Sequence, residues 1–142
     1  MFLLDTDHVV ISQQQSMPEY DHLIQRVRQH APSLFFVSVI SFHEQVMGWN
    51  AYISQAKDVS GVVRGYERLQ RVLSNFSEAQ VLAFDDAAAD IFADLRKRRI
   101  RIGTMDLRIA AIALSQEMTV LSRNLDHFRK VPGLKVQDWT IP

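Results

Sequence analysis

The sequence contains no cysteine, which excludes disulfides, thiolate metal sites, iron–sulfur clusters and cysteine nucleophiles. Such a chain suits a reducing compartment, and we expect a cytoplasmic protein. Glycine and proline are scarce as well, with 5 and 4 residues, while hydrophobic residues make up 47% of the chain, so a disordered or fibrous protein is excluded. The 142 residues are close to the usual size of one domain, and we expect residues 1–142 to share a single core.

Long hydrophobic runs and an excess of one charge are absent too. The apolar run at residues 34–40 is far shorter than the roughly 20 residues that span a bilayer, so we expect no membrane protein. The first residues lack the basic segment of a secretory signal and reach Asp5 almost at once. Lys and Arg together number 16, as do Asp and Glu, so any contact with nucleic acid must depend on a local basic patch.

Short apolar runs alternate along the chain with stretches of helical periodicity. The runs that predict strands are residues 1–4, 34–40, 80–84, 118–121 and 134–139, and the last one alternates apolar and polar residues as an edge strand does. Apolar residues recur at helical spacing over 88–95 and 107–114, and the stretch 52–76 predicts one or two further helices. The pattern predicts an α/β domain, with a central parallel sheet of about five short strands and helices on both faces.

Acidic and amide side chains follow several of these apolar runs. They are Asp5 and Asp7 after the first run, Glu44 in the first turn of the helix after the second, Asp106 at the start of the buried helix, and Asn124 with Asp126 after the fourth. In open α/β sheets ligands bind at the carboxyl ends of the strands, so these side chains would meet at one edge. Carboxylates that converge raise one another's pKa unless a cation neutralises them. Oxygen ligands without cysteine favour Mg²⁺ or Mn²⁺ over zinc.

Each of these polar residues also has a purely structural interpretation. A single Asp at a strand end or helix start is commonly a cap or a turn residue. We predict that Ser41 and Thr104 are helix N-caps, and that Asp85 and Asp86 cap and charge another helix start. His8 and His43 flank the acids, and we expect neutral polar side chains at a cleft rim rather than metal ligands.

Four motifs, taken in order, resemble a known family. The motifs are Leu3-Leu4-Asp5-Thr6-Asp7, Ser41-x-x-Glu44-x-x-x-Gly48, Thr104-x-Asp106-x-x-Ile109-Ala110-Ala111, and Leu121-Ser122-Arg123-Asn124-x-x-x-Phe128 before a final Pro132-Gly133-Leu134-x-Val136-x-Asp138-Trp139. Each motif alone is weak, but their order and spacing together resemble the PIN-domain ribonucleases, and most of all the VapC-type toxins of prokaryotic toxin–antitoxin pairs. The resemblance runs from residue 1 to residue 139.

The resemblance implies a metal-dependent endoribonuclease. Its catalytic residues would be Asp5, Glu44, Asp106 and Asn124, with Asp5 and Asp106 holding Mg²⁺ or Mn²⁺. Many members carry Asp where this chain has Asn124, which leaves open whether one or two ions bind, and whether Asp7 or Asp126 joins the site. Hydrolysis through a metal-bound water would leave a 5′-phosphate and a 3′-hydroxyl.

The resemblance also implies substrate contacts and partners. Thr104 would orient Asp106 or the phosphate, and Arg98, Arg99 and Arg101, within a run of five basic residues in six, would bind RNA. That run equally suits a helix C-terminus, where cations favour the dipole. Partners would be the RNA substrate, a cognate antitoxin protein and a second copy in a homodimer. The apolar side chains on one short helix, Met47, Trp49, Tyr52 and Ile53, are either part of such an interface or part of the core.

Two other functions fit part of the sequence. Asp5-x-Asp7 after an apolar strand also resembles haloacid-dehalogenase-like phosphatases, with Asp5 as the nucleophile, but that chemistry leaves Glu44 and Asp106 unexplained. A non-catalytic Mg²⁺-binding receiver-like domain would need an acceptor Asp at the end of a middle strand and a Lys at the end of the last one. Neither strand ends that way.

Overall fold

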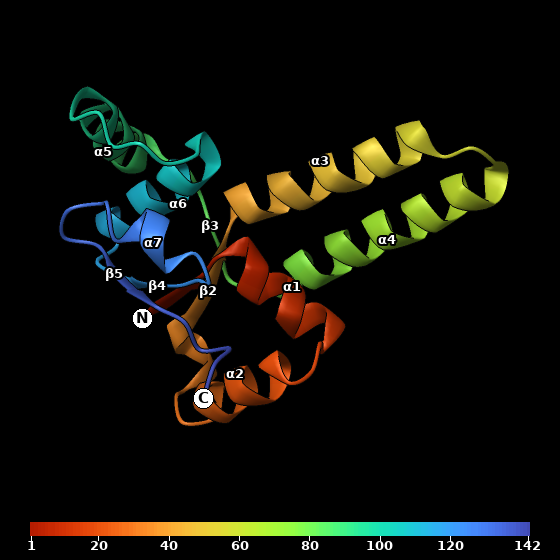
Figure 1. The fold of residues 1–142 in the computed structure, drawn as a ribbon, viewed down its shortest axis with the longest axis horizontal. Coiled ribbons are helices and arrows are strands. Elements are labelled where there is room, and N and C mark those ends of the chain that lie inside the picture. The colour runs from red at the N-terminus through yellow and green to blue at the C-terminus, as the bar shows by residue number, and fades with distance from the viewer.

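A five-stranded parallel sheet forms the centre of the computed structural model, which describes residues 1–142 (Figure 1). Its strands are β1 (Phe2–Leu4), β2 (Phe35–Ser38), β3 (Val81–Leu82), β4 (Thr119–Leu121) and β5 (Lys135–Gln137). Their spatial order is β3-β2-β1-β4-β5, and every neighbouring pair is parallel. The predicted sheet is confirmed, and β5 is the edge strand that its alternating sequence indicated.

Helices cover both faces of this sheet. They are α1 (Thr6–Gln14), α2 (Glu19–Val27), α3 (Val39–Gln55), α4 (Val59–Ser77), α5 (Asp86–Lys97), α6 (Thr104–Ser115) and α7 (Leu125–Phe128), with a 3₁₀ turn, η1 (Pro32–Leu34), before β2. Val120 of β4 packs with α5 and α6, while its neighbour Leu121 packs with α1 and α2. Successive strand residues point to opposite faces, so the two neighbours belong to two different clusters.

Two predicted helix caps are wrong by a few residues. The N-cap of α3 is Ser38, whose hydroxyl accepts the backbone N–H of Ser41 at 3.2 Å, so Val39 and Ile40 begin the helix instead of ending the strand. The N-cap of α6 is Gly103, and Thr104 is the first residue inside the helix. The cap at Asp85 is confirmed, because its carboxylate accepts the N–H of Ala88 at 3.0 Å.

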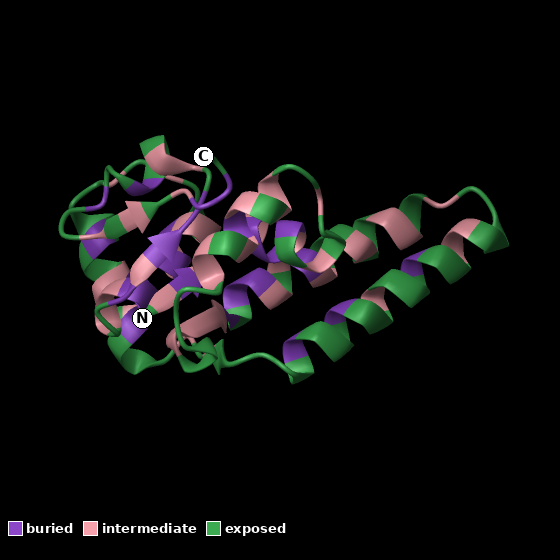
Figure 2. Cartoon of the chain, turned by 90° about the horizontal axis from the view of Figure 1, so that it is seen from below, coloured by how far each residue is buried: buried purple, intermediate pink, exposed green.

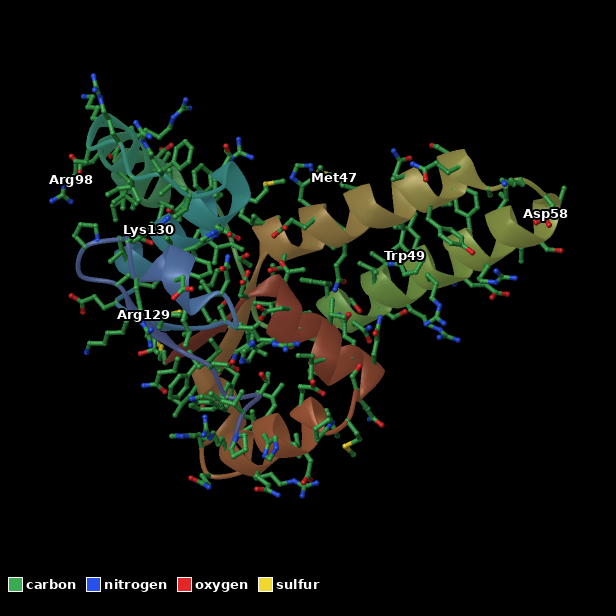
Figure 3. All side chains as sticks on the ribbon, viewed as in Figure 1. Met47, Trp49, Asp58, Arg98, Arg129 and Lys130 are labelled. Carbon is green, nitrogen blue, oxygen red and sulfur yellow. The ribbon has the colours of Figure 1, made fainter.

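Helices α3 and α4 pair in opposite directions and project from the body as a long arm (Figure 1). Much of the arm is exposed, whereas the strands β1, β2 and β4 at the centre of the sheet are buried or half-buried (Figure 2). Asp58 caps α4 at the far tip of the arm, where its carboxylate accepts the N–H of Gly61 at 2.8 Å (Figure 3). Met47, Trp49, Tyr52 and Ile53 were expected on one short helix. They lie instead on α3, which has 17 residues.

The helices predicted from the sequence did not include α1 and α2. In α1 the apolar residues are contiguous, and no apolar stripe at helical spacing marks the helix. The helix begins because Asp5 accepts the backbone N–H of Thr6 at 2.8 Å, which ties the helix start to the carboxyl end of β1. No helix in the structure combines the length and the hydropathy needed to cross a bilayer.

Candidate functional site

The carboxyl ends of β1, β2 and β4 bring the predicted acidic residues together at one edge of the sheet. Asp5 directly follows β1 and is 5% exposed. Glu44 lies in the second turn of α3 rather than in the first, because that helix begins earlier than its sequence indicated. Asp106 lies in the first turn of α6, and Asn124 is the N-cap of α7 just beyond β4.

Asp5 is held by hydrogen bonds from two segments, the start of α1 and the residue that follows β4. Its Oδ1 accepts the N–H of Thr6, and its Oδ2 accepts the hydroxyl of the buried Ser122 at 2.7 Å. Burial first, and then the nearby charges of Asp7 and Asp106, raise the pKa of Asp5 to about 7, against the two hydrogen bonds, which act to lower it. A buried carboxyl group that repels its neighbours in this way is costly to ionise without a cation.

Glu44 is oriented by a hydroxyl from the first turn of α1. The Thr6 hydroxyl lies 2.9 Å from Glu44 Oε1 and 3.0 Å from the Ser41 hydroxyl, so it donates to the glutamate across the gap between α1 and α3. Burial raises the pKa of Glu44, and Asp106 and Asp7 contribute repulsion in the same direction. Thr6 therefore positions Glu44 toward the other acids.

Asp106 and Asn124 form the side of the cluster nearest to α6 and α7. The Asn124 amide donates to Asp106 Oδ2 at 3.2 Å and lies 2.9 Å from Nδ1 of His127. Burial raises the pKa of Asp106, with Asp7 adding repulsion, while His127 and Asn124 act to lower it. His127 Nδ1 itself lies 3.9 Å from Asp106 Oδ2.

Asp7 belongs to the cluster, and Asp126 does not bond to it. Asp7 Oδ2 accepts the backbone N–H of Arg123 at 2.9 Å, and Asp7 Oδ1 lies 2.7 Å from Nδ1 of His8. Burial acts to raise the pKa of Asp7, but the hydrogen bonds from His8 and Arg123 outweigh it and the pKa is lowered. Asp126 is exposed in the first turn of α7.

His8 lies inside the protein and not at a cleft rim as we expected. Its side chain is 0% exposed, and its Nε2 accepts the backbone N–H of Trp139 at 3.2 Å. Since Nε2 acts as an acceptor, the hydrogen of the neutral ring is on Nδ1 and is donated to Asp7. His8 thus fixes Asp7 and ties the C-terminal segment to α1, while His43 is exposed on α3.

Of the predicted substrate residues, Thr104 shares the first turn of α6 with Asp106, and the three arginines lie at and just after the end of α5. Thr104 is exposed at the first position of α6. Arg98 is the C-cap of α5, lies 3.7 Å from Asp94 and points outward at the end of the molecule away from the starts of α1 and α3 (Figure 3). Arg99 follows with a positive φ of 57°, and Arg101 is exposed. Arg96 and Lys97 occupy the last turn of α5, as a helix C-terminus favours.

Sequence reasoning assigned no role to Ser122, and gave Thr6 and His127 no part in the site. Ser122 is fully buried and links Asp5 to the backbone, because its hydroxyl donates to Asp5 and accepts the N–H of Asn124 at 2.9 Å. Only their positions in the sequence could have indicated these residues. Each of them lies one to three residues from a predicted site residue, near the end of a strand or in the first turn of a helix.

The chemistry of the cluster fits a hard divalent cation. Four carboxylates and an amide supply oxygen donors, and three of the carboxylates have raised pKa values because they are buried near one another. No three Asp, Glu or His side chains are drawn together closely enough to surround an ion in this structure. A bound cation would offset the repulsion that contributes to these raised pKa values.

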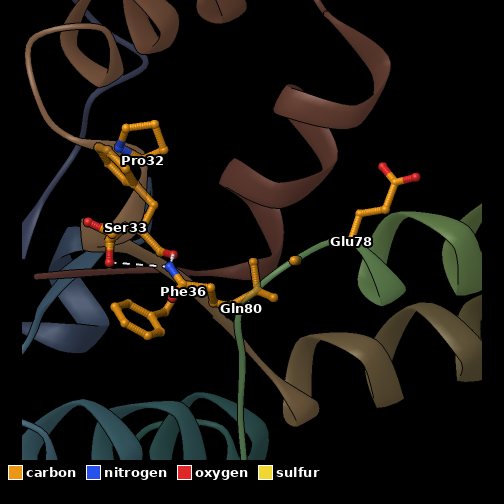
Figure 4. Close-up of a pocket in the computed structure, with 8 residues that line it drawn as sticks. Pro32, Ser33, Phe36, Glu78 and Gln80 are labelled. Carbon is orange, nitrogen blue, oxygen red and sulfur yellow. Dashed lines mark hydrogen bonds between the residues drawn. The ribbon is translucent and has the colours of Figure 1, made fainter.

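A cavity at the opposite ends of the strands lies outside the carboxylate cluster. It measures about 480 Å³ and is lined by residues of η1, β2 and the segment 78–80 (Figure 4). The Gln80 amide closes one side by donating to the carbonyls of Ser33 and Phe35, at 3.2 and 2.9 Å. None of the site acids lines it, so the carboxylate edge remains the candidate site.

Comparison with known proteins finds one family model and several similar proteins that agree with one another. The model of the PIN domain family matches residues 7–134. The chain is 30% identical to "Ribonuclease VapC1" of Haemophilus influenzae over 99% of this chain and 98% of that protein. It is 28% identical to "tRNA(fMet)-specific endonuclease VapC" of Salmonella typhimurium over 97% of each.

Solved structures share the fold. The DNA-bound VapBC structure from Salmonella typhimurium matches with a TM-score of 0.72 and 26% identity over 97% of each chain. The VapBC-1 structure from nontypeable Haemophilus influenzae matches with a TM-score of 0.75 and 23% identity, over 99% of this chain and 98% of that one.

Proposed function

The chain belongs to the PIN-domain family, in its VapC branch, and from this membership we propose that it is a divalent-metal-dependent endoribonuclease acting as the toxin of a toxin–antitoxin pair. The observation that carries the proposal is the carboxylate cluster. Asp5, Glu44 and Asp106 come from three separate segments, and each has its pKa raised by burial at the same sheet edge. Perturbed acids that converge in this way mark functional sites.

The residues of the chain would divide the work of hydrolysis. Asp5 and Asp106 would hold Mg²⁺ or Mn²⁺, with Ser122 and Asn124 fixing their carboxylates. A bound divalent cation makes a coordinated water a stronger nucleophile and stabilises charge on phosphoryl oxygens. Glu44, oriented by Thr6, would accept a proton, and Asn124 would complete the catalytic set.

Substrate binding and partners extend the proposal. Thr104 would contact the phosphate, and Arg98, Arg99 and Arg101 would attract RNA over a longer range. The cognate antitoxin is proposed because a similar solved structure is titled "Toxin-antitoxin complex from Klebsiella pneumoniae". A homodimer is proposed as well, with a mass near twice 16.3 kDa in light scattering. A strict monomer at micromolar concentration would overturn the dimer and leave the chemistry standing.

The two other functions gain nothing from the structure. A phosphatase or receiver-like site needs a lysine and further acids beside Asp5. Lys57 lies at the tip of the arm between α3 and α4, and Asp85 caps α5. Neither contributes to the shifted pKa of Asp5.

Cleavage assays test the proposed function directly. Wild-type protein and the Asp5→Asn and Glu44→Gln variants are incubated with RNA and with p-nitrophenyl phosphate, in Mg²⁺ or in excess EDTA. We expect RNA cleavage by the wild type in Mg²⁺ only, at least a hundredfold loss in either variant, as for a group that acts on the reacting atoms, and no turnover of the phosphate ester. Full activity in EDTA or in Asp5→Asn would overturn the proposal.

The arginines are tested by their effect on salt dependence. Changing Arg98 and Arg99 to Ala should flatten the slope of log affinity for RNA against log salt by about 0.7 for each lost phosphate contact. An unchanged slope would assign the two side chains to the end of α5 alone.

A further inference from the structure

A polar pocket of about 580 Å³ lies between α1, α3 and α4, beside the carboxylate cluster and outside it. Gln13 of α1, Gln45 and Trp49 of α3, and Arg68 and Arg71 of α4 are among the residues that line it. The three helices meet where the arm joins the body, and Trp49 lies between α3 and α4 (Figures 1 and 3). None of the acids of the cluster lines this pocket.

Gln45 brings an unpaired polar atom to the pocket. The residue is 9% exposed, and its amide nitrogen donates to Gln13 Oε1 at 3.1 Å, but its Oε1 is buried with no hydrogen-bond partner. Exchanging the oxygen and nitrogen of the amide would leave the other atom unpaired instead, so the vacancy persists in either orientation. A buried polar group without a partner costs free energy, which a ligand with a complementary group recovers.

Arg68 and Arg71 supply uncompensated positive charge at the same pocket. They are three residues apart on α4, so they share one face of the helix, and both are exposed. The four ion pairs of the structure involve other residues, and neither guanidinium donates a hydrogen bond. Planar guanidinium groups suit the oxygens of a phosphate.

The pocket lies in line with the carboxylate cluster. Thr6 bonds Glu44, and Gln13 bonds the next residue of α3, Gln45. Thr6 and Gln13 are seven residues apart on α1, which corresponds to about 10 Å along the helix axis. The pocket is therefore close enough to the acids for one RNA chain to reach both.

We propose that this pocket binds one nucleotide of the RNA substrate beside the cleaved bond, with its phosphate at Arg68 and Arg71 and its base against the Gln45 amide. The inference rests on the proposed function and adds a specificity subsite to it. Nucleotides combine an anion with N–H groups on a flat ring, and single-stranded bases are read by hydrogen bonds to their edges beside aromatic side chains such as Trp49. Gln45 is then the residue that selects the base.

The test uses a random-sequence, single-stranded RNA library and full-length protein. Affinity is measured by fluorescence anisotropy in EDTA, and the bases flanking each cut are read by sequencing after cleavage in Mg²⁺. The Arg68→Ala/Arg71→Ala variant should bind about tenfold more weakly or worse, with a flatter salt dependence. Gln45→Met, which keeps the volume and removes the unpaired atom, should erase a base preference on the order of tenfold at one position near the cut while cleavage continues.

The matched control is Lys57→Ala/Arg64→Ala, which removes two positive charges from the same arm outside the pocket. It should retain wild-type affinity and base preference. If the pocket variants behave like this control while the wild type cleaves RNA, the subsite is wrong and the proposed function stands. Loss of antitoxin binding in those variants with unchanged RNA behaviour would assign the pocket to the protein partner and overturn the proposal. A wild type that neither binds nor cleaves the library overturns both.

Discussion

Asp5 carries the most strongly shifted carboxyl group at the sheet edge, with its pKa raised to about 7 by burial and by Asp7. Between its ordinary pKa of 3.8 and about 7, the folded chain keeps a proton that the unfolded chain has released. The free energy of unfolding therefore falls as pH rises through this window and stays low above it. The metal-free protein bears this cost at neutral pH.

Asp5→Asn should remove that cost. In EDTA, we expect the variant to be more stable than the wild type at pH 8 by a few kcal/mol, and nearly equal to it at pH 4, because the wild-type carboxyl is then protonated. Urea unfolding at several pH values measures this difference. A variant that is less stable than the wild type at pH 8, or a difference that does not change with pH, would show that Asp5 is not strained by its surroundings.

Ser122 is the residue that holds Asp5 in place, and its hydroxyl is fully buried. Ser122→Ala leaves Asp5 Oδ2 and the N–H of Asn124 without their partner, so the free energy of unfolding should fall by about 1–3 kcal/mol. Ser77→Ala is the control, because its exposed hydroxyl bonds only the Ser74 carbonyl and its loss should cost less than about 0.5 kcal/mol. Equal effects of the two changes in urea unfolding would contradict this role.

At the scale of single elements, a helix could be predicted from the sequence when its buried residues recur at helical spacing. The helix α6 was found because Leu107, Ala110 and Ala111 repeat at helical spacing and are buried. Helix α1 was missed because its start is specified by the Asp5 cap and not by an apolar stripe. The end of β2 was placed too late because Val39 and Ile40, although β-branched, follow the Ser38 cap and enter α3.

The arm formed by α3 and α4 offers a paired test of its packing. Gly48 of α3 has nothing within 4 Å of a would-be Cβ, whereas a Cβ on Gly65 of α4 would collide with Cγ1 of Ile53. Gly48→Ala should raise the free energy of unfolding by about 0.5–1 kcal/mol through helix propensity. Gly65→Ala should lower it by about 1–3 kcal/mol through overpacking. Thermal unfolding that shifts in the same direction for both variants would show that the two helices do not pack as described.

At the scale of the whole molecule, the parallel topology is what made the site predictable. Polar residues that follow different strands meet at one edge, so Asp5, Glu44 and Asn124 were candidates from their positions, and the family resemblance joined Asp106 to them as a catalytic set. Their hydrogen-bond partners could not, because the bonds from Thr6 to Glu44 and from Ser122 to Asp5 join residues 38 and 117 positions apart. Such pairings depend on helix angles and strand register, which local patterns do not encode.

The central claim is that this carboxylate edge binds a divalent cation, and proton release on Mg²⁺ binding tests it most directly. Calorimetric titration at pH 6 in buffers of different ionisation enthalpy should show binding with release of about one proton, because a carboxyl with a pKa of about 7 must ionise to become a ligand. The release should fall toward zero at pH 8.5 and be much reduced in Asp5→Asn. Absence of Mg²⁺ and Mn²⁺ binding, or proton release that is the same at both pH values and in the variant, would contradict the account.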